Sequence, residues 1–147
     1  MHVLLATDGS QQSLKAARFL GTLVNPSAIE RITVVAVIRP LAAVPFAHEL
    51  GGEQAAGDTE AFALSFRREA QAAAERIAAE LQGKASRVDT VIRSGSPADE
   101  IIRAADEVEA DLIVVGGRGK GTVGAILMGS VAHRVLHHAL CPVLVAR

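Results

Sequence analysis

Residues 111–130 have the sequence DLIVVGGRGKGTVGAILMGS, in which an apolar, largely β-branched run leads into a glycine-rich segment. A run of apolar residues without alternation is typical of a strand that is covered on both faces. A helical pattern begins after the glycines, near Ser130. The stretch therefore predicts a buried parallel strand, a glycine loop and a helix, which together form one unit of an α/β sheet.

The same alternation of short apolar runs and longer helical periods extends over the whole chain. It favours right-handed crossovers and a single doubly wound five-stranded parallel sheet with helices on both faces. The third strand alternates in polarity, so we expect it nearer an edge of the sheet. The expected strands are 2–7, 31–38, 87–93, 111–116 and 142–146, and the expected helices are 11–23, 58–82, 97–109 and 130–140.

Residues at the helix ends support these boundaries. Ser10 and Ser96 are candidate N-caps, Pro97 suits a first helical turn, and Gly83 is expected to stop the long helix. Residues 39–57 form the one long connection, with two prolines and three glycines. A connection of that length in a compact domain is usually a lid or an insertion.

Composition excludes several classes of protein. The 147 residues, half of them hydrophobic, predict a single domain, 1–147, with a sizeable core. A net charge of −1 and only four aromatic residues, all Phe, argue against binding to nucleic acid. No signal-peptide pattern and no bilayer-spanning stretch is apparent, and the single cysteine fits a reducing compartment. We therefore expect a cytoplasmic protein with no nucleic-acid or membrane partner.

The glycine-rich segment is the candidate ligand site. Glycine N–H groups can approach an anion without obstruction by a Cβ atom, and the start of the next helix adds unpaired donors. Five glycines in residues 116–124, followed by Gly129 and Ser130, favour a phosphate site over a loop that needs glycines only for its turns. The P-loop motif fails because Gly121 follows Lys120. A Gly-x-Gly-x-x-Gly match from residue 119 lies too far past the strand and too near the end of the chain for a dinucleotide fold.

A more specific pattern is Gly116-x-x-Gly119, then nine residues, then Gly129-Ser130. It resembles the nucleotide-binding signature of the universal stress protein family. The segments ATDGS after the first strand, ADLIVVG at the fourth and CPVLV at the fifth extend the resemblance over nearly the whole chain. The resemblance implies the strand order 3-2-1-4-5, with a ligand crevice at the carboxyl ends of the first and fourth strands.

The resemblance also implies which residues would bind ATP. Main-chain groups would contact ribose and phosphates, the start of the last helix would hold the phosphates, and apolar side chains would form the adenine slot. These residues are Gly116 and Gly119 for ribose and phosphates, Gly129, Ser130 and Val131 at the helix start, and Val37, Ala6 and Val115 in the slot.

Charged residues also lie near this site in the sequence. A carboxylate beside phosphates would repel them, so we expect Asp8 near the base, the ribose or a cation bound through water. The alternative is that Asp8 caps the following helix. Arg118 and Lys120 could neutralise phosphate charge or lie solvated at the surface. Mg²⁺ could accompany the triphosphate, although no protein ligand set for it is visible.

Three further features lie near the end of the chain. His133 and His137 have the spacing that places two metal ligands on one helix face, but no third ligand is evident, so a surface or interface role is favoured. Cys141 is expected to pack rather than react. The strand Pro142–Ala146 would be an apolar edge. In the family this strand pairs with its two-fold mate, so the resemblance implies a homodimer.

The function expected from these observations is that of an ATP-binding universal stress protein, a nucleotide-dependent regulatory or stress-response protein that is not an enzyme. Neither a Ser-His-Asp arrangement nor a pair of carboxylates with supporting spacing is apparent. The alternatives are the same fold binding AMP or cyclic AMP, and a slow ATPase.

Overall fold

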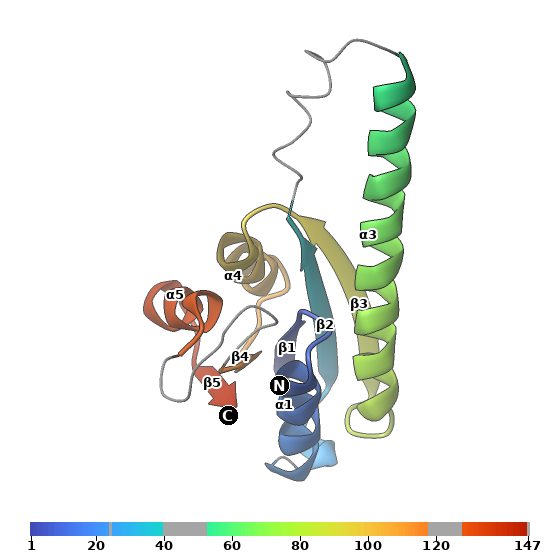
Figure 1. The fold of residues 1–147 in the computed structure, drawn as a ribbon. Coiled ribbons are helices and arrows are strands. Elements are labelled where there is room, and N and C mark those ends of the chain that lie inside the picture. Colours follow the sequence, from blue (N-terminus) through green and yellow to red (C-terminus); the bar gives the residue numbers. More distant parts are fainter. Residues whose placement is uncertain (24, 40–52, 118–127, 147) are drawn as a thin grey trace.

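Strands and helices alternate along the chain (Figure 1). The computed structural model describes residues 1–23, 25–39, 53–117 and 128–146. The strands are β1 (His2–Thr7), β2 (Arg31–Ile38), β3 (Arg87–Ser94), β4 (Leu112–Gly116) and β5 (Val143–Ala146). The helices are α1 (Gln11–Leu23), α3 (Glu53–Glu80), α4 (Pro97–Glu107) and α5 (Ser130–His138), with a 3-10 turn at Pro26–Ala28.

The strands form one parallel sheet in the order β3-β2-β1-β4-β5. The predicted fold class and strand order are therefore confirmed, and β3 lies at an edge as its alternating pattern indicated. In the register of the central strands, Leu5 of β1 lies between Val34 of β2 and Val114 of β4. Since all strands run the same way, their carboxyl ends meet at one edge of the sheet.

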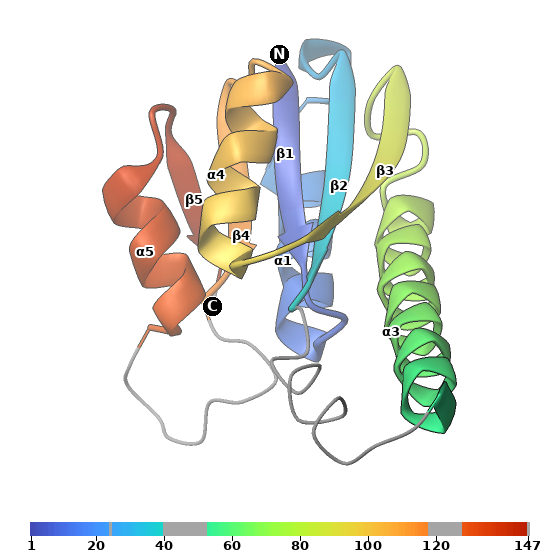
Figure 2. The ribbon, with the colours of Figure 1, turned by 90° about the horizontal axis from the view of Figure 1, so that it is seen from above.

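Helices cover both faces of the sheet (Figure 2). Leu5 packs beneath α1 and α3, whereas its neighbour Leu4 packs beneath α4 and α5, and both side chains are fully buried. Successive strand residues point to opposite faces, which explains why the central strands are apolar without interruption. Among the helices that the structure describes, none has the length and apolar character needed to cross a bilayer.

The start of the long helix was predicted wrongly, whereas the other predicted bounds agree with the structure within two residues. The long helix begins at Glu53 rather than at residue 58, so the predicted connection 39–57 is shorter at its carboxyl end, and residues 40–52 of it lie outside the described residues. A single glycine at position 57 costs a helix about 1 kcal/mol, which surrounding Ala, Glu and Gln residues can offset. Ser96 occupies the N-cap position of α4, but its side chain makes no capping hydrogen bond.

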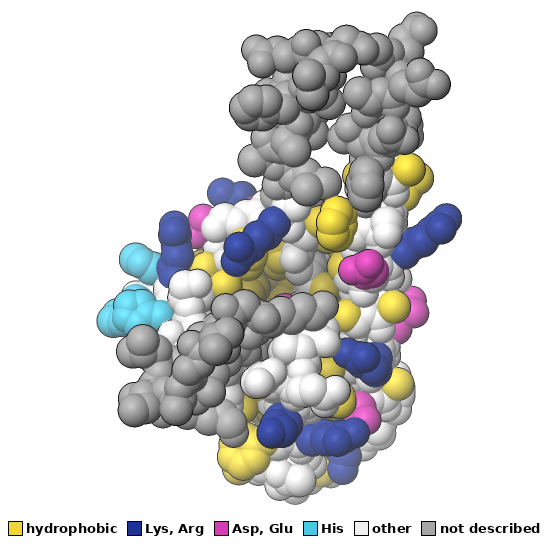
Figure 3. All heavy atoms as spheres, viewed as in Figure 1, with side chains coloured by type: hydrophobic (Ala, Val, Ile, Leu, Met, Phe, Trp, Pro, Cys, Tyr) yellow, Lys and Arg dark blue, Asp and Glu magenta, His cyan; other side chains and the backbone are white. Residues whose placement is uncertain are grey.

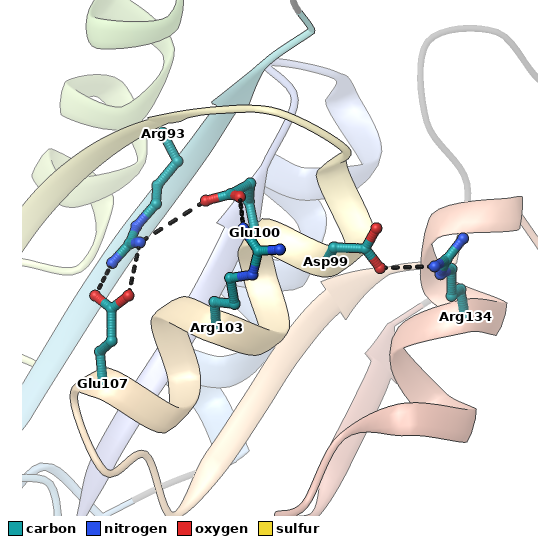
Figure 4. Close-up of polar contacts among 6 residues, drawn as sticks. All are labelled: Arg93, Asp99, Glu100, Arg103, Glu107 and Arg134. Atoms are coloured by element: carbon teal, nitrogen blue, oxygen red, sulfur yellow. Dashed lines mark hydrogen bonds and ion pairs between the residues drawn. The ribbon is translucent and has the colours of Figure 1, made fainter.

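A cluster of ion pairs connects α4 with the edge strand β3 (Figure 4). Glu100 is largely buried, pairs with Arg103 at 2.8 Å and lies 3.7 Å from Arg93. Arg93 also donates two hydrogen bonds to Glu107, which hold the pKa of the Glu107 carboxyl below its usual value.

Gly95, in the turn between β3 and α4, has a φ of 152°, and a Cβ atom there would lie 2.9 Å from Cγ of Glu100. The turn therefore requires glycine for both its backbone and its close approach to a paired carboxylate.

We expect Gly95→Ala to lower the free energy of unfolding by about 3 kcal/mol, because it combines a disfavoured φ with a steric clash. Gly83→Ala is the matched control: Gly83 has a φ of 74°, but nothing lies within 4 Å of an added Cβ atom. Gly83→Ala should therefore lower the free energy of unfolding only by the cost of the disfavoured φ, about 1 kcal/mol. Urea unfolding monitored by circular dichroism measures both, and equal losses would contradict the role assigned to Glu100.

Candidate functional site

The candidate site lies at the carboxyl edge of the sheet, where β1 and β4 end side by side. The helices that follow these strands, α1 and α5, pack on opposite faces of the sheet. A sheet that winds both ways from two adjacent strands leaves a crevice between them, which is where ligands bind in such folds. Figure 3 looks onto this edge and shows a hollow with hydrophobic side chains inside it.

Backbone hydrogen bonds link the residue after β4 to the start of α5 and to the end of β5. The N–H of Gly129 donates to the carbonyl oxygen of Gly117 at 2.7 Å, and the N–H of Gly117 donates to the carbonyl oxygen of Ala146 at 2.6 Å. The residues predicted from the two ends of the glycine signature, Gly116 and Gly129-Ser130, are thereby brought together. Gly119 lies outside the described residues, as do Arg118 and Lys120.

The first turn of α5 presents backbone donors. The N–H groups of Ser130, Val131 and Ala132 have no acceptor within the helix, because the first residues of any α-helix lack one. The N-cap residue is Gly129, which has no side chain to accept from them. The N–H of Gly129 itself is already bonded to Gly117, so the donors that could reach an anion begin at Ser130, whose side chain is also exposed.

The apolar residues predicted for a base slot lie on one face of the sheet. Ala6 and Val115 are buried beneath α4 and α5, at 8% and 3% exposure, and Val37 packs against the same cluster while remaining half-buried. Val131, which was predicted to contribute its backbone amide at the helix start, lies in the first turn of α5 and is half-buried.

Gly116 points to the opposite face, toward α1. A Cβ atom on Gly116 would lie 3.3 Å from the backbone carbonyl carbon of Gln12 and 3.3 Å from the backbone nitrogen of Ser13. Such separations from rigid backbone atoms are tighter than ordinary packing allows. Glycine at this position therefore lets the first turn of α1 approach β4, a structural role that the sequence pattern did not reveal.

Asp8 lies exposed in the turn between β1 and α1. Its Oδ1 accepts a hydrogen bond from the N–H of Ser10 at 3.0 Å, and Oγ of Ser10 accepts from the N–H of Ser13 at 3.2 Å. Ser10 is thus the N-cap of α1, as predicted. Asp8 orders the turn that precedes the cap.

The sequence analysis missed how firmly this turn is held. Gly9 has a φ of 73°. Its N–H donates to Oγ1 of Thr7 at 3.1 Å, and its carbonyl oxygen accepts from Nη2 of Arg76 at 3.0 Å. Thr7 also shares a buried hydrogen bond with Ser13, at 2.9 Å. The Thr and Ser residues are close in sequence and could have been noticed, but Arg76 belongs to α3 and comes near only through the fold.

The described residues contain no group of three or more His, Cys, Asp or Glu side chains arranged to hold a metal ion. Cys141 is half-buried and packs against the cluster beneath α4 and α5, as expected. Burial raises the pKa of its thiol above the usual value for cysteine.

The sign of this pKa shift gives a testable expectation. A thiol with a raised pKa is mostly protonated at pH 8, and only the thiolate reacts. We expect Cys141 in the folded protein to react with iodoacetamide more slowly at pH 8 than the same residue in urea-unfolded chain, with a difference that narrows as the pH approaches 10. A native rate equal to or above the unfolded rate would contradict this environment.

The geometry defines the class of protein: a doubly wound α/β sandwich in which the first turn of α5 lies beside the end of β4 at the carboxyl edge of the sheet. The family model described as the universal stress protein family matches residues 1–147, and the chain belongs to that family.

Individual relatives agree with this assignment. Universal stress protein MJ0531 of Methanocaldococcus jannaschii is 32% identical over 146 residues, covering 99% of this chain and 81% of the relative. The solved structure of the hypothetical protein MJ0577 superposes with a TM-score of 0.81 at 25% identity, covering 99% of this chain and 94% of that one. A universal stress protein crystallised in complex with cAMP gives a TM-score of 0.61 at 26% identity, covering 100% and 96%.

Proposed function

We propose that this protein binds ATP in the crevice between β1 and β4 and acts as a nucleotide-dependent regulatory protein. The observation that carries the proposal is the first turn of α5, whose N–H groups from Ser130 onward have no capping side chain and lie beside the end of β4. Unpaired N–H groups and the positive end of the helix dipole favour a bound anion there. The phosphate tail would lie at this turn, and any Mg²⁺ would be held through the phosphates.

The remaining parts of the crevice suit the rest of the nucleotide. Half-buried Val37 offers an apolar contact for the adenine ring, with Ala6 and Val115 forming the walls, and the N–H of Val131 adds a donor at the start of α5. Asp8 is exposed at the end of β1, where a carboxylate could accept hydrogen bonds from ribose hydroxyls without facing the phosphates. We propose binding rather than catalysis, with hydrolysis slow at most.

A second ligand is supported by one comparison. The relative that was crystallised with cAMP has the same fold and 26% identity to this chain. AMP or cyclic AMP would occupy the same slot but place fewer phosphate oxygens at α5. The affinities for ATP, AMP, cyclic AMP and adenosine therefore distinguish the two candidates. Tighter binding of ATP than of the other three supports ATP as the ligand, and tighter binding of AMP or cyclic AMP supports the second candidate.

Substitution of Gly129 tests where the phosphates bind. We expect Gly129→Asp to weaken ATP binding at least tenfold, because a carboxylate would repel the phosphates and occupy the same N–H groups. The φ of −62° and ψ of 147° at this position suit an Asp N-cap, so the stability of the fold should be maintained or raised. Gly129→Asn is the neutral control and should lose less affinity. Calorimetry on protein stripped of bound nucleotide measures the affinities, and thermal unfolding measures stability.

A further control replaces the serine at another helix start. Ser96→Ala alters the N-cap of α4, whose side chain makes no capping hydrogen bond. It should leave ATP affinity unchanged. If wild type, Gly129→Asp and Gly129→Asn bind ATP equally well, the phosphates do not bind at the start of α5. Absence of binding to the wild type at millimolar ATP would refute the proposed function.

We also propose that the protein is a homodimer through β5. This strand is at the edge of the sheet, and its apolar residues Val143, Leu144 and Val145 are only half-buried. The carbonyl oxygens of Pro142 and Ala146 accept hydrogen bonds from residues of or next to β4. By strand alternation, the N–H and carbonyl groups of Val143 and Val145 face the open edge, where a second copy could pair with them.

We expect the wild-type protein to sediment as a dimer at micromolar concentration and Val145→Pro to sediment as a monomer. Proline removes an N–H group at the open edge, and edge strands tolerate proline without loss of the fold. Val145→Thr keeps the N–H group and the β-branched shape and should remain dimeric. A monomeric wild type, or a dimeric Val145→Pro with unchanged circular dichroism, would place the contact elsewhere or exclude it.

A further inference from the structure

Two histidines lie together on the outer face of α5. His133 and His137 are both exposed, and their ring centroids are 4.4 Å apart with the ring planes tilted by 48°. The helix buries its opposite face, through Ala132 and Val135. Neither imidazole therefore contributes to the core, and packing alone does not account for their placement.

The spacing of the two rings is close to that of a chelating pair. Side chains at positions i and i+4 of a helix project from one face, which is the spacing that helical zinc sites use. Two imidazole nitrogens that share one metal ion, each about 2.1 Å from it, bring their ring centroids to roughly 5 Å. The observed 4.4 Å requires only a small opening of the pair.

We propose that His133 and His137 form a surface site for a late first-row divalent metal ion, of the class of Zn²⁺, Ni²⁺ and Cu²⁺. Imidazole nitrogen is a preferred ligand for these ions. Water completes the coordination, because the described residues offer no group of three or more ligating side chains. The ion is therefore exchangeable and bound at the surface of α5.

Nearby charge is compatible with a bound cation. Arg134 lies between the two histidines in sequence, but its guanidinium points toward α4 and forms an ion pair with Asp99 at 2.8 Å (Figure 4). That carboxylate offsets the positive charge nearest to the pair.

The test is calorimetric titration of the tag-free full chain with Zn²⁺ and with Ni²⁺ at pH 7.5. We expect one ion per chain with micromolar affinity, and a loss of affinity of at least tenfold in His133→Ala and in His137→Ala. His138→Ala is the matched control because His138 is exposed on the same helix, one position further on and turned away from the pair. It should bind within twofold of wild type.

A spectroscopic readout separates this site from binding elsewhere. Cu²⁺ bound to the wild type should show coordination by two imidazole nitrogens in its electron paramagnetic resonance spectrum, and each single variant should lose one. Circular dichroism checks that the variants keep their helices. If an alanine variant loses helical structure, His133→Gln or His137→Gln replaces it in the titration. Absence of binding at millimolar metal, or equal losses in His138→Ala, would overturn the proposal.

Discussion

The burial of β1 on both faces is the constraint on which this structure depends. Val3, Leu4 and Leu5 have no exposed surface, so the strand needs a neighbour on each side and helices above and below. Parallel pairing with β2 and β4 meets the first need, and α1 and α3 on one face with α4 and α5 on the other meet the second. Burying such strands contributes the hydrophobic free energy that offsets the entropy of ordering the chain.

The crevice follows from the same constraint. Chain segments that leave β1 and β4 must turn to opposite faces, and the ends of these two strands are left without a helix directly above them. Short local bonds then fix what surrounds the opening. The bond between Gly129 and Gly117 sets the start of α5, and the bonds of Gly9 with Thr7 and Arg76 set the turn that carries Asp8.

Glycine has different physical roles around this opening. Gly116 allows α1 to approach the sheet, whereas Gly129 leaves the first turn of α5 without a side-chain cap. Only the second role exposes donors to a ligand. The glycines of this signature therefore differ in what they do in the fold, and α5 has its N-terminus beside the end of β4 while its outer face presents the histidine pair.

Apolar periodicity determined the order of strands and helices and the burial of both sheet faces, because burial imposes a period of 2 or 3.6 on any sequence that folds this way. It failed at the start of α3, where tolerance of Gly57 within a helix depends on the residues around it. The strand order and the main residues of the crevice followed from the resemblance to a known family.

Only the tertiary structure decided which contacts those residues make. Arg76 reaches Gly9 across 67 positions of sequence, and Gly116 meets the backbone at Gln12 and Ser13 across more than a hundred. Ser96 stands at the N-cap position that the sequence predicted, but its side chain makes no capping hydrogen bond. Such contacts depend on angles and separations between elements, which arise from the packing of the whole sheet and leave no periodic trace along the chain.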